Sequence, residues 1–318
     1  MNNKIEGEKI LITGGAGFIG TALIRTLIAK NEIVVFDNMR RDALSGSELS
    51  SHSNLKTIEG DVLDRDQLNK AISGSTYIVH CAGIAGIRTV VKSPTLTMRV
   101  NMVGTANVLA AAVERCEAKR VVCFSTSEVF GEYAMGAVET DKSVIGAAGE
   151  ARWTYAVSKL AEEHLAMAYN REFGLPTSVV RPFNIYGPGQ VGEGALRTFI
   201  KRALRNEPIE VHGEGTQIRA WCYVDDMVEG TRLTMAHPKA IGESFNIGNH
   251  RSVETINGLA NMVVRVLHSK SEIRYIERPS ADVELRIPSV GKARELLGFE
   301  ARIGLEDGIK RTAEYYRK

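Results

Sequence analysis

Short apolar runs alternate with longer stretches of helical periodicity through the first 181 residues. The runs are rich in valine and isoleucine, and they predict strands at Lys9–Thr13, Ile33–Asp37, Leu55–Glu59, Tyr77–Cys81, Arg120–Ser125 and Thr177–Arg181. The stretches around them predict helices at Phe18–Lys30, Asp66–Ser73, Thr95–Glu117 and Thr154–Phe173. Strands that are apolar throughout are buried on both faces, and strand–helix alternation implies crossover connections. The pattern therefore predicts an α/β fold built on a doubly wound parallel sheet.

The pattern changes after Arg181, where prolines and glycines interrupt the chain repeatedly up to Gly194. Such residues break regular structure and are typical of ligand-facing loops. Shorter elements follow, with helices predicted at Ala195–Arg205, from Asp225 and at Val253–Leu267, and strands at Ile209–His212 and Ser244–Ile247. We therefore expect residues 1–181 to form one domain and residues 182–318 to form mainly a smaller lobe, partly interleaved with the sheet.

Composition narrows the class of partner. The 318 residues carry a formal net charge of +2, so the chain lacks the basic excess that general binding to nucleic acids or anionic membranes requires. The four cysteines include no Cys-x-x-Cys pair and the seven histidines have no metal-ligand spacing, which argues against a disulfide scaffold and a metal site. No run approaches the ~20 apolar residues of a membrane span, and the polar N-terminus does not resemble a signal peptide. These features predict a cytoplasmic protein with reduced thiols.

A glycine-rich turn joins the first predicted strand to the first predicted helix. Gly14, Gly17 and Gly20 have the spacing Gly-x-x-Gly-x-x-Gly, and Phe18 and Ile19 begin the helix. Glycines let the backbone come close to a pyrophosphate, and the free N–H groups of a helix N-terminus favour an anion there. The alternative is a tight turn that binds nothing, but the strand–turn–helix context favours a dinucleotide site.

An acidic residue follows where such a site needs one. Asp37 ends the second predicted strand, with Asn38 beside it, and its carboxylate can accept hydrogen bonds from an adenosine ribose. This favours NAD over NADP, whose 2′-phosphate the carboxylate would repel, although the arginine pair 40–41 leaves NADP open. After the third strand, Asp61 and Val62 are expected to flank the adenine, and Asp61 could equally be the N-cap of the next helix.

Tyr155 and Lys159 are four residues apart and therefore share one face of the predicted helix. A free tyrosine has a pKa of about 10 and is a poor base at neutral pH, but a nearby ammonium and a positive nicotinamide favour its phenolate. Such a phenolate could take a proton from a sugar hydroxyl. The alternative is an ordinary pair on a helix surface.

Hydroxyl and carboxylate side chains cluster after the fifth predicted strand, in the segment 125–131 (Ser-Thr-Ser-Glu-Val-Phe-Gly). Ligands of doubly wound sheets bind beyond the carboxyl ends of the strands, so this segment is expected to face the cleft. With the glycine turn, the Tyr-x-x-x-Lys pair and the segment 181–188 (Arg-Pro-Phe-Asn-Ile-Tyr-Gly-Pro), the chain resembles the extended short-chain dehydrogenase/reductase family over nearly its whole length. The resemblance is to NAD-dependent nucleotide-sugar epimerases, dehydratases and decarboxylases. It implies a Rossmann sheet with a smaller C-terminal substrate-binding lobe.

The resemblance also implies roles for matching residues. Tyr155 would be the catalytic base, Lys159 would lower its pKa and bind the nicotinamide ribose, Thr126 would hydrogen-bond the reacting hydroxyl, Asn184 would hold the substrate, and Arg219 and Arg286 would contact its nucleotide half. Arginine suits phosphate and carboxylate because its fork binds them bidentately, although either arginine could be a surface ion-pair residue. Asn101 would support the active-site end of its helix, or be a buried amide bonded to the backbone.

The choice of reaction depends on Ser127 and Glu128. The family shares an oxidation at sugar carbon 4, and a carboxylate at position 128 can move protons at carbons 5 and 6. Similar Thr-Ser-Glu clusters occur in uronate decarboxylases and GDP-mannose 4,6-dehydratases. In dTDP-glucose 4,6-dehydratases an aspartate stands where this chain has Ser127, which argues against their direct acid-catalysed loss of water.

Two further segments favour a uronate substrate. The segments 152–159 (Arg-Trp-Thr-Tyr-Ala-Val-Ser-Lys) and 282–289 (Asp-Val-Glu-Leu-Arg-Ile-Pro-Ser) resemble a UDP-glucuronate decarboxylase of the family, in which the arginine matching Arg286 lies close to the sugar carboxylate. The segment 85–88 resembles glucuronate 4-epimerases and makes Arg88 a second possible partner of a carboxylate. The leading hypothesis is decarboxylation of UDP-glucuronate, with 4-epimerisation of a UDP-hexose or UDP-uronate next and a dehydratase third. A non-enzymatic NAD(P)-binding scaffold is disfavoured because the Tyr–Lys pair is present.

Two predicted helices carry apolar residues on more than one face. The runs are Val108, Leu109, Ala111, Ala112 and Val113 in the first, and Leu160, Leu165, Met167 and Ala168 in the second. Packing on the sheet accounts for one face of each helix. The remainder suits a homodimer with a four-helix interface, as in many members of the family.

Overall fold

A parallel sheet of seven strands, in the order β12-β7-β5-β4-β1-β2-β3, forms the central layer of the molecule. The computed structural model describes residues 4–277 and 283–317. The strands are β1 (Lys9–Thr13), β2 (Glu32–Asp37), β3 (Leu55–Glu59), β4 (Tyr77–His80), β5 (Arg120–Phe124), β7 (Thr177–Pro182) and β12 (Ser244–Ile247). Each strand predicted for this sheet is present within one residue of its expected ends, which confirms the α/β fold with a doubly wound Rossmann sheet.

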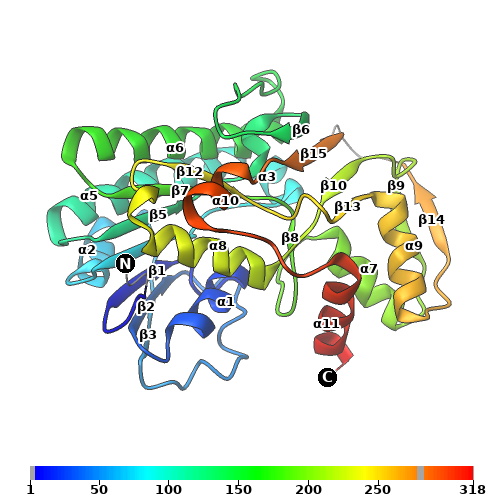
Figure 1. Ribbon diagram of the computed structural model, residues 1–318, viewed down its shortest axis with the longest axis horizontal. Helices are drawn as coiled ribbons and strands as arrows, with labels where there is room; N and C mark the ends of the chain where they lie inside the picture. The colour runs from blue at the N-terminus through cyan, green and yellow to red at the C-terminus, as the bar shows by residue number, and fades with distance from the viewer. Residues whose placement is uncertain (1–3, 278–282, 318) are drawn as a thin grey trace.

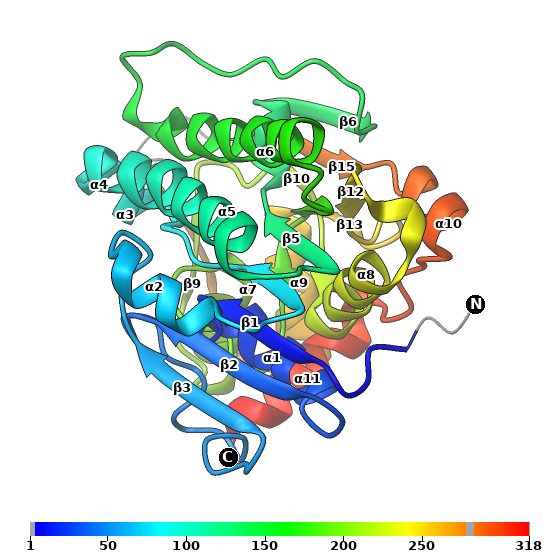
Figure 2. The same ribbon diagram turned by 90° about the vertical axis from the view of Figure 1, so that its left-hand side faces the viewer.

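Helices cover both faces of this sheet because its strands are apolar on both sides. One face holds α1 (Phe18–Leu27) and α8 (Val224–Ala236), and the other holds α2 (Arg65–Ile72), α5 (Gly104–Arg115) and α6 (Thr154–Phe173) (Figure 2). On β1, Ile10 and Ile12 belong to the hydrophobic core on the α1 and α8 side of the sheet, whereas Leu11 belongs to the core on the α2, α5 and α6 side. Successive side chains of a strand point to opposite faces, so one apolar run supplies two separate cores.

The helix predicted at Thr95–Glu117 is interrupted. It consists of α4 (Pro94–Met98), a π-helical turn at Arg99–Val103, and α5. Wider turns of this kind often occur at functional sites, and this one contains the fully buried Asn101.

The stretch 94–115 has the length and apolar composition of a membrane-spanning helix. Its residues Val108, Leu109, Ala111 and Ala112 are fully buried in the core on the α5 side of the sheet. Val113, which is 40% exposed, is the one member of the predicted apolar run that remains on the surface. The exposed apolar area on this helix is therefore smaller than the sequence predicts, because most of the run packs against other parts of the same chain.

A second, smaller group of elements lies beside the carboxyl ends of the large sheet (Figure 1). It contains a four-stranded sheet with the order β13 (Val253–Thr255), β10 (Ile218–Ala220), β15 (Leu285–Pro288) and β6 (Tyr133–Ala137), and two strand pairs, β8 (Ile185–Tyr186) with β11 (Cys222–Tyr223) and β9 (Ile209–His212) with β14 (Ile273–Ile276). Its helices α7 (Ala195–Leu204), α9 (Ile256–Leu267) and α11 (Leu305–Arg317) pack against one another. Two further helices lie against elements of the large sheet, α3 (Ile87–Lys92) beside α4 and α6, and α10 (Gly291–Leu297) beside β12 and α8.

The helix predicted at Val253–Leu267 begins three residues too early. Val253–Thr255 is the strand β13, which pairs antiparallel with β10, and the Thr255 hydroxyl caps α9 by accepting a hydrogen bond from the Gly258 N–H (2.8 Å). Two of the three strand residues are β-branched, and a threonine side chain is a favoured N-cap, so both features place the helix start after Thr255.

The chain passes between the two groups of strands more than once. β12 and α8 come from the second part of the sequence and pack with the large sheet, whereas β6 comes from the first part and pairs with β15. A division at residue 181 therefore cuts through both sheets. This interleaving places the segments after β5 and β7 next to the small sheet.

Candidate active site

A cavity of ≈560 Å³ opens at the carboxyl ends of β1, β2, β4 and β5. The strand order reverses beside β1, and this is where doubly wound sheets bind ligands. The residues predicted to hold the cofactor line this cavity, together with three of the predicted catalytic residues. They are Gly14, Gly17, Phe18, Ile19, Gly20, Asp37, Asn38, Asp61 and Val62 for the cofactor, and Thr126, Tyr155 and Lys159 for catalysis. Sequence positions more than a hundred residues apart thus share one cavity.

The glycine turn leaves no room for side chains. Gly14 has φ +69°, and a Cβ there would lie 2.5 Å from the backbone nitrogen of Ala82. A Cβ on Gly20 would lie 2.6 Å from Cα of Gly15. Gly17 is the N-cap of α1 and has no side chain to satisfy the first N–H groups of the helix. The turn therefore fits the close approach of a pyrophosphate to the backbone.

We expect Gly14→Ala to weaken NAD binding by at least about tenfold, because the new methyl group must displace the backbone after β4 and strain a left-handed residue. Calorimetric titration with NAD would measure the loss. Gly46→Ala is the matched control, since a Cβ at Gly46 meets nothing within 4 Å and its φ is not positive. Equal NAD affinity in the two folded variants would contradict the assignment of this turn to the cofactor.

Asp37 is held at the edge of the glycine turn. Its Oδ2 accepts a hydrogen bond from the Ala16 N–H (3.0 Å), and its Oδ1 accepts one from the Met39 N–H (2.8 Å). Burial raises the pKa of this carboxyl, and the two hydrogen bonds act in the opposite direction. Arg41, which could have received a 2′-phosphate, instead donates from Nη2 to the Ala85 carbonyl (2.8 Å). The site therefore presents a carboxylate where an adenosine ribose would lie, as NAD requires.

Asp61 is not the N-cap of the helix that follows it. Asp64 takes that position, since its side chain accepts hydrogen bonds from the N–H groups of Asp66 and Gln67 at the start of α2. The Asp61 carboxylate instead accepts from the Leu63 N–H (3.0 Å) in a local turn and lines the cavity. The N-cap interpretation of Asp61 is therefore wrong, and its place beside the adenine stays a prediction.

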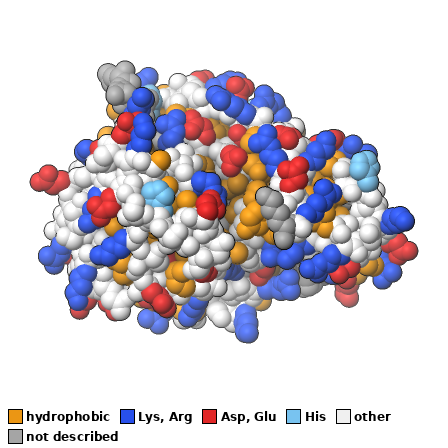
Figure 3. Space-filling model, turned by 90° about the horizontal axis from the view of Figure 1, so that it is seen from below, with side chains coloured by type: hydrophobic (Ala, Val, Ile, Leu, Met, Phe, Trp, Pro, Cys, Tyr) orange, Lys and Arg blue, Asp and Glu red, His pale blue; other side chains and the backbone are white. Residues whose placement is uncertain are grey.

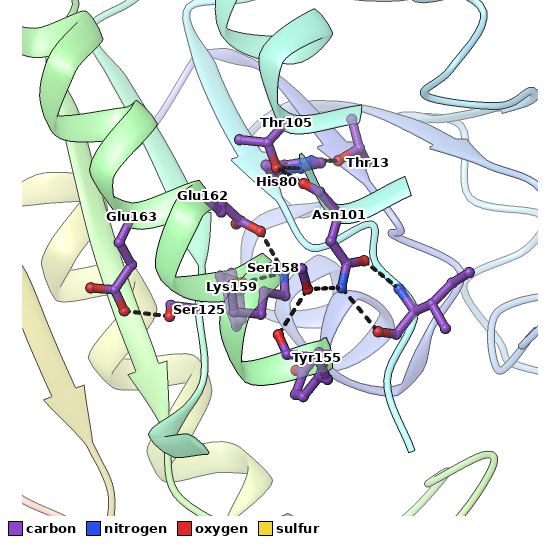
Figure 4. A network of polar contacts seen from close by, with 12 residues as sticks. Thr13, His80, Asn101, Thr105, Ser125, Tyr155, Ser158, Lys159, Glu162 and Glu163 are labelled. Carbon is purple, nitrogen blue, oxygen red and sulfur yellow. Dashed lines mark hydrogen bonds and ion pairs between the residues drawn. The ribbon is translucent and has the colours of Figure 1, made fainter. Parts of the chain in front are cut away.

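Tyr155 and Lys159 face the cavity from the first turns of α6 (Figure 4). Lys159 is buried, and its Nζ donates to the Phe124 carbonyl (2.6 Å) and to Oε2 of Glu162 (2.7 Å). The pKa of Tyr155 is raised, because burial and the negative charges of Glu128 and Glu162 outweigh the positive charge of Lys159 and a hydrogen bond with Thr126. Of the groups around the hydroxyl, Lys159 and Thr126 are the ones that favour its ionised form.

Asn101 ties the π-helical turn to α6. Its Nδ2 donates to Oγ of Ser158 (2.9 Å) and to the Ile84 carbonyl (3.2 Å), and its Oδ1 accepts from the Ile84 N–H (2.8 Å). Ser158 in turn donates to the Tyr155 carbonyl (2.8 Å). Asn101 is thus a buried amide bonded to the backbone, and it fixes the part of α6 that carries the Tyr–Lys pair.

The segment after β5 forms a charged cluster that only partly matches the prediction. The Thr126 hydroxyl accepts a hydrogen bond from the Glu128 N–H (3.2 Å), and Ser127 is buried. Oε2 of Glu128 lies 2.6 Å from Nη1 of Arg152, and its Oε1 lies 3.8 Å from Nη1 of Arg286. Sequence reasoning missed Arg152, because nothing local marks a side chain that pairs across a fold. Glu128 is therefore an ion-paired carboxylate between two arginines.

The predicted substrate-binding residues are not among the described residues that line this cavity. Arg219 and Arg286 are register partners on β10 and β15, and both are buried, so neither is a surface ion-pair residue. Asn184 has φ +43° and donates from Nδ2 to the Ala220 carbonyl (2.8 Å) beside β10. Arg88 is exposed on α3. The structure thus brings Arg286 to Glu128 and leaves Arg88 apart, while position 282 of the predicted segment lies outside the described residues.

Basic and acidic side chains are interspersed over the face of the molecule drawn in Figure 3. Within residues 4–277 and 283–317, no group of three or more histidine, cysteine, aspartate or glutamate side chains could hold a metal ion.

Comparison with known proteins gives results that agree with each other. The model of the NAD dependent epimerase/dehydratase family matches residues 10–248. A UDP-N-acetyl-alpha-D-glucosaminuronate decarboxylase from Bacillus cytotoxicus is 32% identical, with 98% of either chain covered. UDP-glucuronic acid decarboxylase 6 of Arabidopsis thaliana is 33% identical over 97% of this chain and 89% of that protein.

A solved structure extends the likeness to three dimensions. The UDP-glucuronic acid 4-epimerase of Bacillus cereus, in complex with UDP-glucuronic acid and NAD, superimposes with a TM-score of 0.89. The two chains are 28% identical, and the match covers 97% of this chain and 99% of the epimerase. The similarity therefore includes the small lobe as well as the large sheet.

Proposed function

Since the chain belongs to the NAD-dependent epimerase/dehydratase family and is an NAD-dependent enzyme that modifies nucleotide sugars, we propose that it decarboxylates a UDP-linked uronic acid. The observation that carries the proposal is the Glu128–Arg286 pair beyond β5. The Glu128 N–H donates to the Thr126 hydroxyl, and the Glu128 charge acts on Tyr155. Two relatives of nearly full length are decarboxylases of such sugars, which supports the same choice.

The proposed reaction begins at the hydroxyl on sugar carbon 4. Bound NAD supplies the reversible oxidation of that carbon. The Tyr155 phenolate takes the hydroxyl proton, the Thr126 hydroxyl orients the same oxygen, and the Lys159 ammonium stabilises the negative charge. The resulting ketone is β to the uronate carboxylate.

Carbon dioxide then leaves because the bond from carbon 5 to the carboxylate breaks and its electron pair moves to the carbon 4 oxygen as an enolate. Tyr155, now protonated, lies on the side of that oxygen and can stabilise the charge. A proton added at carbon 5 restores the ketone. Glu128 is the carboxyl group of the cluster that can transfer this proton. Reduction of the ketone completes the conversion to a UDP-pentose.

The Arg286 guanidinium is our proposed partner of the substrate carboxylate. It is buried on β15, and Oε1 of Glu128 lies 3.8 Å from its Nη1. An arginine fork binds a carboxylate bidentately and therefore favours a uronate over a neutral hexose. In this proposal the residues 182–318 supply most of the contacts to the nucleotide sugar, including Asn184 and Arg219, and residues 1–181 hold NAD.

The test is incubation of the purified enzyme and NAD with UDP-glucuronate, and separately with UDP-N-acetylglucosaminuronate. We expect carbon dioxide and a UDP-sugar that is lighter by one carboxyl group, measured by mass spectrometry. A product of unchanged mass with inverted carbon 4 would replace this proposal with 4-epimerisation. That alternative is favoured by the likeness of the fold to a UDP-glucuronic acid 4-epimerase.

We further propose that the enzyme is a cytoplasmic homodimer in which α5 and α6 of each chain form a four-helix interface. These helices lie side by side on one face of the large sheet (Figure 2). Exposed valines remain on this part of the surface at Val103, Val113 and Val157, each 40–47% exposed. The four cysteines are free, as expected in a reducing compartment.

Light scattering of the wild type should give about twice the chain mass of 34.8 kDa, and Val103→Glu should shift it toward a single chain. A charge in the centre of an apolar interface is desolvated without a partner, which opposes association. Val144→Glu is the control, because Val144 is 75% exposed and lies outside both α5 and α6. A wild type that scatters as a single chain at working concentration would contradict the dimer.

A further inference from the structure

A second acidic group lies beside the Tyr–Lys pair and has no role in the reaction described above. Glu162 is fully buried on α6, one turn after Lys159, and its Oε2 lies 2.7 Å from Nζ of that lysine. Its other carboxylate oxygen has no hydrogen-bond partner among the residues that the structure describes. A buried carboxylate is costly unless a charge compensates it, so the contact with Lys159 is its principal compensation.

Glu163, the next residue of α6, is a buried glutamate whose contacts are structural. Glu163 accepts hydrogen bonds from Nε and Nη2 of Arg181 (2.9 and 2.6 Å) and from the Ser125 hydroxyl. Its charge is therefore neutralised away from the reacting groups. Glu162 instead forms its ion pair with Lys159, the lysine next to Tyr155 (Figure 4).

We propose that Glu162 is a positioning residue that fixes the Lys159 ammonium and sets the electrostatic field at the Tyr155 hydroxyl. The inference rests on the proposed function only in taking Tyr155 as the base. The Lys159 charge favours the Tyr155 phenolate, whereas the carboxylates of Glu128, after β5, and Glu162 oppose it. Of the two opposing carboxylates, Glu162 is the one that also contacts Lys159.

Among the described residues, Lys159 is the one cation that acts on Glu162. The titratable groups that face this pair are Tyr155 and Glu163 on α6, Cys123 on β5, and His80 and Cys81 at the end of β4. Burial lowers the pKa of His80 to about 3, so the imidazole is neutral.

His80 is held by neutral hydrogen bonds. Its ring nitrogens lie 2.7 Å from the Thr13 hydroxyl and 3.0 Å from the Thr105 hydroxyl, which in turn donates to the Asn101 carbonyl. These contacts bring no charge to Glu162. Burial raises the pKa of Glu162 to about 7 against the opposing effect of Lys159, so its charge changes within the working pH range of an enzyme.

The experiment measures the pKa of Tyr155 directly in the NAD complex. Protein labelled with 13C at the tyrosine Cζ is titrated by NMR, and Tyr155→Phe identifies the signal of residue 155. We expect Glu162→Gln to lower the Tyr155 pKa by about one unit, because it removes the opposing charge and keeps the volume. Glu162→Asp keeps a carboxylate near the ammonium and should leave this pKa close to that of the wild type.

Glu172→Gln is the matched control, since it removes one exposed carboxylate from the same helix. An unchanged or higher Tyr155 pKa in Glu162→Gln would overturn the proposal, even if stability fell. Should that variant not fold, Glu162→Met offers the same comparison without a polar group.

The readout also separates this inference from the proposed reaction. If Glu162→Gln lowers the Tyr155 pKa while no variant releases carbon dioxide from a uronate, the inference stands and the proposed substrate is wrong. If carbon dioxide is released but the Tyr155 pKa is equal in wild type and Glu162→Gln, the function stands and Glu162 only supports the fold. In the supporting case, the acid limb of the pH profile of kcat/KM moves to lower pH in Glu162→Gln by the shift measured by NMR.

Discussion

Tyr155→Phe should reduce turnover of the nucleotide sugar by about a thousandfold while NAD remains bound. The substitution removes one oxygen at the point where the cavity receives the Lys159 ammonium and the Thr126 hydroxyl, and it leaves the aromatic ring in place. Tyr155 is the one tyrosine among the described residues that line this cavity, so none of these supplies a second base of that kind. NAD binding depends on the glycine turn and Asp37, which the substitution does not touch.

The measurement pairs single-turnover kinetics with an NAD titration. Tyr169→Phe is the control, because Tyr169 lies on the same helix and packs against the ring of Phe173 at 5.0 Å between centroids. The control should turn over close to the wild-type rate. If Tyr155→Phe retained wild-type turnover, the proton of the sugar hydroxyl would have to leave through another group.

Arg286→Gln should lower kcat/KM for UDP-glucuronate by about a hundredfold, because a substrate carboxylate would lose a charged, bidentate partner inside the protein. The arginine is buried on β15, where solvent cannot compensate for its loss. The variant also separates two roles. If Arg286 binds the sugar carboxylate, inhibition by UDP alone should stay unchanged.

Equal weakening of UDP and UDP-glucuronate would instead place Arg286 at the nucleotide half of the substrate. Arg274→Gln is the control, since Arg274 is an arginine of the small lobe whose side chain is 61% exposed. It should leave both constants unchanged. Thermal melting of both variants shows whether the loss of the Glu128 contact alters folding.

The large sheet could be predicted because its information is local. Most of its strands are short apolar runs, the glycine turn follows β1 directly, and Asp37 is the last residue of β2. Strand order did not have to be known for these residues to meet, since parallel strands bring their carboxyl ends to one edge. Most of the cofactor site therefore follows from sequence pattern alone.

The small lobe could not be predicted in the same way. Strands such as β8, β10 and β11 are two or three residues long and exist only through pairing with distant partners. The same is true of single contacts: Arg152 meets Glu128 from 24 positions away, and the burial of Glu162 depends on which face of α6 meets α5. Periodicity also does not distinguish a π-helical turn from the helix around it, so the turn that holds Asn101 could not be predicted although Asn101 itself was singled out.

The large sheet contains β12 from the second part of the chain, and the four-stranded sheet contains β6 from the first part. The stabilities of the two sheets therefore cannot be separated. A fragment ending near residue 181 would leave the outer edge of β7 without β12, exposing backbone donors and acceptors of an apolar strand to aggregation. The complementary fragment would lack β6, the partner of the β15 strand that carries Arg286. The molecule is therefore expected to melt in a single cooperative transition, and its substrate lobe cannot be exchanged between relatives by joining two halves.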